Sequence, residues 1–369
     1  MMMNEKINII DGIKIDLFIL FTIGLLFIIL YYNNYIIILF ILLFVTYIII
    51  TLYMLIYGYI MYLRRYNQRI WRFAILETRL LINKLKEKGI TFDYYSEEKA
   101  IEFLEKHNYY VKITAYKTNF HKHNNKYIGL DFLALKDLST IDMHLKQWVL
   151  FACLSIEHSL KVNLLKDIQE NGIDEYVILN QYFNSYPNIL NEIEHRRNTP
   201  YTKNLLKKYN HPRYPVYVYF EVIPFGEFVN FYKFYCENYD YNGLDPSILY
   251  CIRNIRNSAA HNNCIIHDLV NKEGYYNIDI VNIISKKLTN TKKKTIQNRL
   301  KNNSIQDFVA VISSIETVIN SEELKIDLFN RLKILFNDRI PRCSEIYKSS
   351  PALNQMYKFC KDIIDSYNF

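Results

Sequence analysis

Residues 145–172 read LKQWVLFACLSIEHSLKVNLLKDIQENG, a strongly apolar stretch without proline. Its apolar residues recur mainly every three or four positions, which predicts an α-helix. Gly172 is expected to end this helix, because glycine readily adopts the backbone conformation that closes a helix. A helix with so much apolar surface must bury it against other elements. The stretch therefore favours a fold built from packed helices.

Helical spacing also appears on both sides of this stretch. Residues 72–90 are predicted to form an amphipathic helix ended by Gly89. Ser96 is expected to cap the start of the next helix, because a serine side chain can accept a hydrogen bond from the free N–H groups there. Further helices are predicted over residues 96–110, 305–320 and 321–338.

The remaining segments of the body are less regular. Residues 214–225 have a strand-like composition, but they contain two prolines and have no clear partner strand, so they are either a loop or the start of a helix. Residues 180–215 and 286–304 are rich in Asn and Lys and predict loops or exposed helices. The chain has only 9 Gly and 8 Pro, which argues against a β-rich or disordered protein. The expected class is all-α, a helical bundle.

Two apolar runs without a charged residue precede this body. The first is LFILFTIGLLFIILY, Leu17–Tyr31, and the second is YIIILFILLFVTYIIITLYMLIYGYIMY, Tyr35–Tyr62. The second run is long enough to cross a hydrocarbon core of about 30 Å, and the first is near the short limit. With a polar break at Asn33 and Asn34, the runs predict a two-helix membrane hairpin within residues 1–63. A single long spanning helix is the alternative.

The residues around these runs predict their orientation. A removable signal peptide is not expected, because acidic residues precede the first run and no small-residue cleavage site follows it. A cluster of arginines follows the second run, from Arg64 to Arg72, and such clusters mark the cytoplasmic side. We therefore expect a hairpin in the inner (cytoplasmic) membrane that contacts lipid through residues 17–62. The soluble domain, residues 64–369, is expected in the cytoplasm.

The composition narrows the range of chemistry. Six cysteines are present, but no two form a CxxC pair and no Cys/His set has zinc spacing. We therefore expect free thiols and neither a metal nor a cofactor. The formal net charge is +8, which suits a polyanionic partner or an anionic membrane surface. The 33 tyrosines are typical of AT-rich coding and are not taken as a sign of RNA binding.

One short segment combines the residue types that RNA cleavage needs. Residues 253–261 read RNIRNSAAH, in which four residues separate Arg256 from His261 and Asn257 follows the arginine. When a 2′-hydroxyl attacks the neighbouring phosphate, protons must be exchanged and negative charge must be neutralised. Histidine exchanges protons near neutral pH, and arginine stays charged and can bind two phosphate oxygens. Asn257 would orient the imidazole or the phosphate through its amide.

Three further segments strengthen this interpretation by their order along the chain. They read NYYVKITAY, LSIEHSLKVNLL and PVYVYFEVIPFGEF, at Asn108–Tyr116, Leu154–Leu165 and Pro215–Phe228. These segments resemble those of the Abi-like abortive-infection proteins, and the Arg256–His261 segment resembles the Arg-polar-x3-His signature of HEPN ribonucleases. The resemblance covers residues 78–264. Lys161 departs from it, since arginine is common at that position in the family.

The resemblance implies an HEPN-like helical bundle in which Arg256, Asn257 and His261 are catalytic. The implied products carry a 2′,3′-cyclic phosphate and a 5′-hydroxyl. The resemblance also implies a homodimer, because HEPN relatives pair two such motifs around a two-fold axis. On an ideal helix, Arg256 and His261 would lie about 140° apart. Either the helix breaks near Ser258, or the site is assembled across a dimer interface.

Two other residues are expected to serve this site. Arg253 shares a helix face with Asn257 and His261, and it is predicted either to contact RNA or to form a structural ion pair. Glu157 lies on the apolar helix. It is predicted to support the site by anchoring an arginine, such as Arg253 or Arg256.

Three hypotheses for function follow from these residues. The first is a membrane-anchored, metal-independent endoribonuclease of prokaryotic abortive infection or toxin–antitoxin defence. The second is a non-catalytic protein in which Arg256 and His261 hold a structured small RNA. The third is a membrane effector whose hairpin disturbs the bilayer. The expected partners are RNA, the membrane and a second copy of the chain, with a small RNA or an antitoxin as a further candidate.

Overall fold

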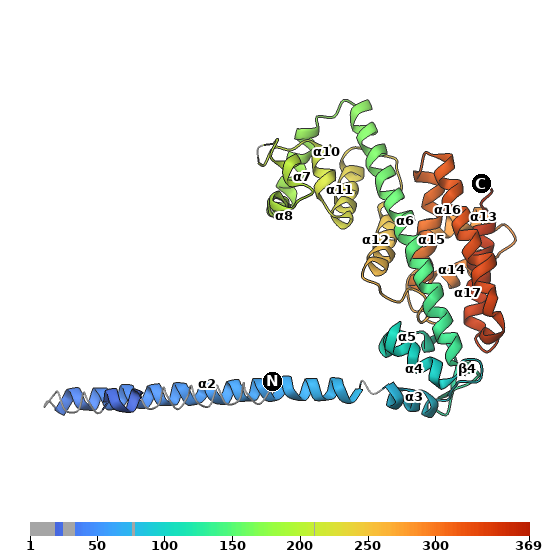
Figure 1. Ribbon diagram of the computed structural model, residues 1–369. Coiled ribbons are helices and arrows are strands. Elements are labelled where there is room, and N and C mark those ends of the chain that lie inside the picture. The colour runs from blue at the N-terminus through green and yellow to red at the C-terminus, as the bar shows by residue number, and fades with distance from the viewer. Residues whose placement is uncertain (1–18, 25–33, 76–77, 210) are drawn as a thin grey trace. The chain divides into compact units, whose positions relative to one another are not determined.

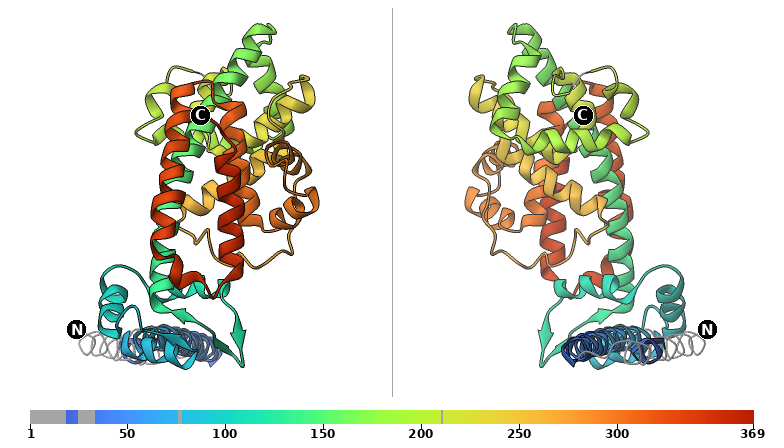
Figure 2. Two further views of the ribbon diagram at one scale, coloured as in Figure 1. Left: turned by 90° about the vertical axis from the view of Figure 1, so that its right-hand side faces the viewer. Right: turned by 90° about the vertical axis from the view of Figure 1, so that its left-hand side faces the viewer.

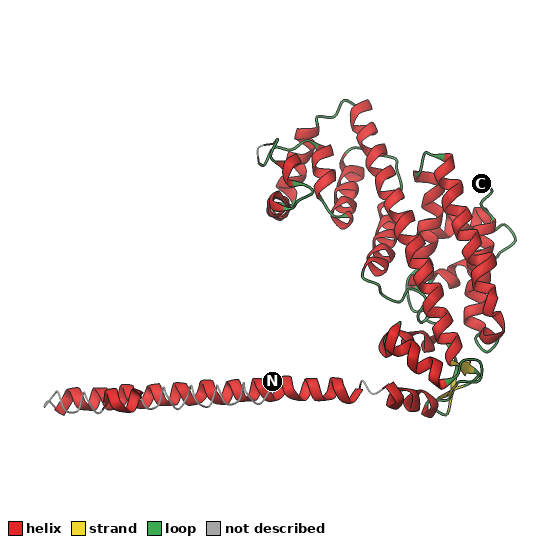
Figure 3. Cartoon of the chain, in the orientation of Figure 1, coloured by secondary structure: helices red, strands yellow, loops and turns green. Residues whose placement is uncertain are grey.

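The structure is a computed structural model that describes residues 19–24, 34–75, 78–209 and 211–369. The chain divides into two units, Met1–Glu77 and Thr78–Phe369. The described residues of both units are mostly helical, and the strands among them are short (Figure 3). The all-α class predicted from the sequence is confirmed.

The first unit contains one long helix, α2, which spans Asn34–Ile75. Asn34 was expected in a turn but is the first residue of α2. The helix continues through residues 63 and 64, where we expected the hairpin to give way to the soluble domain. Residues 19–24 are also helical. The remaining part of the expected turn lies within residues 25–33, outside the described residues, so the hairpin stays a prediction.

Among the described residues, two helices are long and apolar enough to cross a membrane, Leu43–Met61 within α2 and α6 (Phe132–Glu170). The two helices differ in how much of each is buried within the chain. None of the Leu43–Met61 segment is buried within the chain, whereas α6 carries many core side chains. The composition of α6 is therefore explained by packing inside the second unit. Length and composition leave α2 as the better candidate for membrane contact.

The second unit is a helical assembly with two small two-stranded sheets. β1 pairs with β4 in parallel, and β2 pairs with β3 in antiparallel orientation. Its α-helices are α3 (Thr78–Glu87), α4 (Glu97–Lys106), α5 (Tyr110–Ala115), α6, α7 (Glu175–Ser185), α8 (Asn188–His195), α9 (Lys203–Leu206), α10 (Val216–Val222), α11 (Phe225–Asn238), α12 (Pro246–Ala260), α13 (Ile278–Lys287), α14 (Lys293–Leu300), α15 (Asn303–Val318), α16 (Glu322–Ile334) and α17 (Pro351–Asp365). The shorter elements are 3₁₀-helices η1 (Tyr116–Asn119), η2 (Arg196–Asn198) and η4 (Ile340–Tyr347), π-helix η3 (Leu335–Arg339), and strands β1 (Ile90–Thr91), β2 (Lys122–His123), β3 (Lys126–Tyr127) and β4 (Leu130–Asp131).

Helix α6 forms the axis of this unit (Figure 1). It begins earlier than the sequence predicted, because Asp131 caps it: the Asp131 carboxylate accepts a hydrogen bond of 2.8 Å from the N–H of Leu133. It packs against α12 and α15, and α16 and α17 complete the bundle near it (Figure 2). Its fully buried side chains include Val149, Ile156 and Leu164. The helix predicted over residues 145–172 is thus confirmed as a core element.

The local signals at other helix ends were largely correct. The Ser96 side chain accepts a hydrogen bond from the N–H of Lys99 and caps α4. Gly89 follows α3 with a φ of +81°, and a Cβ there would meet the carbonyl oxygen of Tyr127 at 2.7 Å. Residues 214–225 were predicted to be either a loop or the start of a helix. They start helices, since α10 begins after Pro215 and α11 after Pro224.

Several tyrosines donate hydrogen bonds to carboxylates inside this unit. The Glu227 carboxylate accepts from Tyr182 at 2.6 Å and from Tyr219 at 3.0 Å. Burial raises the pKa of both phenols, and the adjoining carboxylate adds to this effect. The phenols therefore stay protonated and act as donors. The same pairing occurs between Tyr116 and Asp142 at 2.9 Å, Tyr235 and Asp167 at 2.6 Å, and Tyr347 and Asp137 at 2.6 Å.

Candidate functional site

Helix α12 carries the Arg-polar-x3-His segment. Asp245 caps its start by accepting a hydrogen bond of 2.7 Å from the N–H of Ser247, and Pro246 occupies the first turn. Ile248, Ile252 and Ile255 are buried at helical spacing, and α12 packs against α6, α11 and α15. This apolar face holds the helix in place.

The helix does not break near Ser258. The N–H of His261 still donates to the carbonyl of Asn257 at 2.9 Å, and the helix ends only after Ala260. Its end is a Schellman motif, in which Asn262 adopts a φ of +56° and the N–H of Asn263 bonds to the carbonyl of Ser258 at 2.8 Å. Of the two alternatives, a helix break near Ser258 is therefore wrong, because regular helical hydrogen bonds continue past that position, and a site across a dimer interface stays a prediction.

The structure brings Arg256 and Asn257 together. The Arg256 Nη1 atom donates to the Asn257 Oδ1 atom at 3.2 Å, and both side chains are half-buried. Arg256 also lies close enough to α6 to act on Cys153: burial raises the pKa of that thiol, and the positive charge of Arg256 opposes the rise. His261 is exposed at the C-cap of α12, roughly 140° from Arg256 around the helix axis. Within one chain, the arginine and the histidine therefore lie on different faces.

Arg253 packs against the Tyr250 ring on α12 and lies near the backbone of α11 at Gly226. Its guanidinium carbon lies 4.8 Å from the centroid of the Tyr250 ring, in cation–π geometry. A Cβ at Gly226, near the start of α11, would lie 3.5 Å from the Arg253 Cδ atom. These contacts favour a structural role for Arg253.

The partner of Glu157 differs from the one predicted. Its carboxylate pairs with the Lys161 ammonium at 2.9 Å, one turn further along α6, rather than with Arg253 or Arg256. The cause is local, since residues four apart on a helix lie side by side. Lys161 also lies 5.8 Å from the centroid of the Phe228 ring on α11. The Glu157–Lys161 pair thus lies beside Phe228 of α11, and Glu157 is paired with a lysine rather than with Arg256.

A buried carboxylate, which sequence reasoning missed, anchors the loop after His261. The Asp142 side chain, on α6, is fully buried and forms an ion pair of 2.8 Å with Lys146. One Asp142 oxygen accepts from the N–H groups of Ile265 and Ile266, at 2.8 and 3.0 Å. The other accepts from the Tyr116 hydroxyl. Asp142 therefore joins α6, the Asn108–Tyr116 segment and the loop that follows the candidate catalytic histidine.

Two lysines converge on Asn262, the residue after His261. The Lys146 Nζ atom donates to the Asn262 side-chain oxygen at 2.8 Å, and the Lys112 Nζ atom donates to its carbonyl at 3.0 Å. Burial lowers the pKa of Lys112, and the charge of Lys146 lowers it further. Lys112 keeps donors for another ligand. Its position within Asn108–Tyr116 was a signal that sequence reasoning did not use.

A pocket of about 400 Å³ with both polar and apolar lining residues lies beside the end of α12. Its lining includes Ser258, Asn263, His267 and Asp307. Burial raises the pKa of the Asp307 carboxyl to about 7, so this group changes charge near neutral pH. Asp307 was not a predicted site residue, because a single acid within the apolar sequence of α15 gives no signal by itself. Among the described residues, no group of three His, Cys, Asp or Glu side chains is arranged to hold a metal ion.

Comparison with known families gives one match. Residues 102–267 match the family described as "Abi-like protein". The matched range contains Lys112, Asp142, Arg256 and His261. The match supports an Abi-like family, as the sequence motifs predicted, and it suggests a part in abortive-infection defence. No curated protein and no solved structure is significantly similar to the chain.

Proposed function

We propose that this chain, with its Abi-like central region, is a metal-independent RNA endonuclease that halts infected cells. The observation that carries the proposal is the end of α12, where half-buried Arg256 and exposed His261 lie inside the matched region and resemble the Arg-polar-x3-His signature of HEPN ribonucleases. The loop after His261 is held by Asp142, so this end of the helix is preorganised.

The proposed reaction is an internal transesterification. The ribose 2′-oxygen forms a bond to phosphorus while the bond from phosphorus to the 5′-oxygen breaks. The 2′-hydroxyl gives its proton to one His261 imidazole. The leaving 5′-oxygen receives a proton either from the same imidazole or from the His261 imidazole of the second copy. Arg256 stabilises the charge on the non-bridging oxygens, and Asn257 fixes the direction of its guanidinium.

The placement of the two residues supports a dimeric site. Because α12 stays helical to Ala260, Arg256 and His261 of one chain face different directions. We propose that two copies meet around the ends of α12, as in HEPN ribonucleases, so that each cleft contains residues of both protomers. Lys112, beside Asn262, is placed to add a phosphate contact next to His261.

We also propose that α2 anchors the protein to the inner membrane. Leu43–Met61 supplies the apolar length, and Arg64 and Arg65 follow it after two residues. Positive residues after a spanning helix favour the cytoplasmic side, which is where RNA is available. On this proposal, the domain that begins at Thr78 acts in the cytoplasm.

Purified full-length protein is expected to cleave total RNA with undiminished rate in excess EDTA. The reason is that charge neutralisation comes from Arg256 and proton exchange from His261, with no step assigned to a metal. Mapping of the new ends should show 2′,3′-cyclic phosphates and 5′-hydroxyls. Loss of cleavage in EDTA, restored by a divalent cation, would contradict the mechanism, as would ends that carry a 5′-phosphate.

A mixture of two inactive variants is expected to regain activity. Arg256→Ala and His261→Ala, each inactive alone, would form mixed dimers in which one cleft retains an arginine from one protomer and a histidine from the other. The variants should be co-expressed with different tags and purified through both, and cleavage by the mixed species is the measurement. Tandem-purified mixed dimers that fail to cleave would show that the pair works within one chain. A monomer at all concentrations would contradict the dimeric site altogether.

A further inference from the structure

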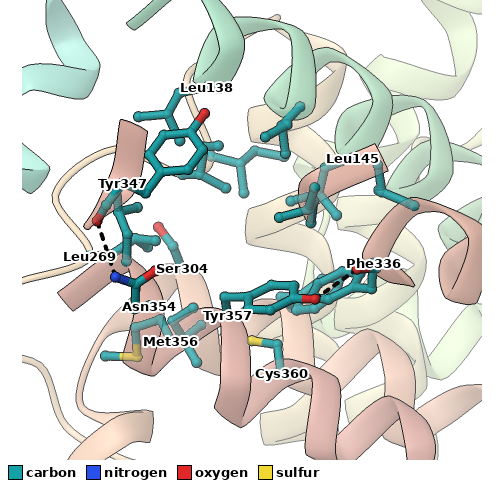
Figure 4. Close-up of a pocket in the computed structure, with 18 of the residues that line it drawn as sticks. Leu138, Leu145, Leu269, Ser304, Phe336, Tyr347, Asn354, Met356, Tyr357 and Cys360 are labelled. Atoms are coloured by element: carbon teal, nitrogen blue, oxygen red, sulfur yellow. Dashed lines mark hydrogen bonds between the residues drawn. The ribbon is translucent and has the colours of Figure 1, made fainter. Parts of the chain in front are cut away.

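An apolar cavity of about 170 Å³ lies behind the loop that follows His261 (Figure 4). It is bounded by α6, α15, α17, the π-helix η3, the 3₁₀-helix η4 and residues 265–269 of the loop. Leu138 and Leu145 lie on one side and Phe336 and Tyr357 on the opposite side (Figure 4). The cavity is distinct from the pocket beside Asp307, although both touch Ser304 and Ile265.

The walls offer flat aromatic and aliphatic surfaces. The Phe336 and Tyr357 rings are nearly parallel, with centroids 5.9 Å apart and an interplanar angle of 7°. Phe308 stacks on Phe336 in the same way, at 6.0 Å and 10°. Met356 and Cys360 add polarisable sulfur atoms to the lining, which suit contacts with a ring.

The polar atoms of the lining are largely occupied by protein partners. The Tyr347 hydroxyl donates to Asp137 at 2.6 Å, and the Tyr357 hydroxyl donates to the carbonyl of Phe336 at 2.9 Å. The Asn354 amide donates to the carbonyl of Tyr347 at 3.1 Å. A cavity needs several polar groups that are free to bond before water is stable inside it. This site therefore favours an apolar occupant over water.

The position of the cavity links it to the candidate site. Ile265, Ile266 and Leu269 line it, and Ile265 is four residues after His261. The N–H groups of Ile265 and Ile266 are held by Asp142, and the N–H of Leu269 is held by the Asn119 side chain at 2.7 Å. The loop after His261 therefore does two things. Its side chains line the cavity, and its backbone is anchored next to the end of α12.

We propose that this cavity binds a small, uncharged apolar molecule of about the size of one aromatic ring, and that its occupancy tightens the loop 262–269. The size follows from the volume, because a dry cavity of about 150 Å³ lined by Leu, Ile and Phe accepts benzene. The π-helix η3 contributes Leu335 and Phe336 to the wall, and such helices frequently occur at functional sites. A regulatory effect on RNA cleavage rests on the proposed function, whereas binding and loop tightening do not.

Fluorobenzene serves as the probe, with binding to detergent-solubilised full-length protein followed by ¹⁹F NMR. Saturable binding by the wild type is expected. Ser344→Phe places a ring at the mouth and Cys360→Leu fills the interior, and each should weaken binding by about tenfold or more. Glu345→Phe is the matched control, because Glu345 is exposed and adjacent to Ser344 but does not line the cavity. Equal binding by all four proteins, or none by the wild type, would overturn the proposal.

Hydrogen exchange distinguishes this proposal from the proposed function. The probe should slow exchange at the amides of Ile265 and Ile266 in the wild type and in His261→Ala alike, and not in Cys360→Leu. Unchanged exchange at these amides despite saturable binding would overturn the coupling to the loop. Binding without any RNA cleavage would contradict only the proposed function, and cleavage without binding would contradict only the cavity proposal.

Discussion

His261→Ala is expected to reduce RNA cleavage by about 10²- to 10⁴-fold, the usual contribution of a general acid–base group. The loss should be chemical rather than structural. His261 is exposed and lies after the last residue of α12, so its truncation should change the free energy of unfolding by only about 0.5 kcal/mol. Single-turnover cleavage of total RNA measures the first quantity, and thermal unfolding measures the second.

The control for this variant is His158→Ala, which removes another exposed histidine, on α6. It should cleave as the wild type does. Persistent cleavage by His261→Ala would remove His261 from the mechanism. If wild type and variant both bind RNA and neither cleaves it, the protein is a non-catalytic RNA-binding protein. Loss of membrane potential in cells that express either protein would instead favour a membrane effector.

Asp142→Ala is expected to destabilise the second unit by about 3–5 kcal/mol, the cost of removing one member of a buried ion pair. Asp142 is fully buried, and it accepts from Lys146, Tyr116 and two N–H groups of the loop. Alanine would leave the Lys146 ammonium buried without its carboxylate. The measurement is denaturant-induced unfolding, and hydrogen exchange at Ile265 and Ile266 should rise as well.

A double-mutant cycle isolates the ion pair from the rest of this network. Asp142→Ala combined with Lys146→Met should cost less than the sum of the two single changes, because no unpaired charge then remains in the core. Glu102→Ala removes an exposed member of the Glu102–Lys106 pair and should leave unfolding essentially unchanged. Additive effects at Asp142 and Lys146 would show that the pair makes no special contribution.

The parts of the fold that the sequence predicted well depend on local signals. The apolar period of residues 145–172, the cap at Ser96 and the turn at Gly89 each involve neighbours in the chain. The contact between Arg256 and Asn257 is also local, but it was not predicted, since Asn257 was expected to orient the imidazole or the phosphate.

The parts that were missed depend on contacts between distant segments. Asp142 and Lys146 stand four residues apart, which suggests only a surface ion pair, until the loop at Ile265 folds back and buries them. The prediction for Glu157 failed for the opposite reason. We expected Glu157 to pair with a distant arginine, but its carboxylate pairs with a neighbouring lysine, Lys161.

The tyrosine–carboxylate pairs differ in how well they tolerate a common mutation, the exchange of tyrosine for phenylalanine. Tyrosine and phenylalanine codons are neighbours, and AT-rich coding keeps both frequent, so drift between them recurs over generations. At a half-buried carboxylate such as Glu227 or Asp167, that drift removes a hydrogen-bond donor, and the lost bond costs about 1–3 kcal/mol. Glu227 has a spare tyrosine and can survive one such loss, whereas Asp167 accepts from Tyr235 alone among the described tyrosines. Selection should therefore act more strongly at Tyr235 than at Tyr182 or Tyr219.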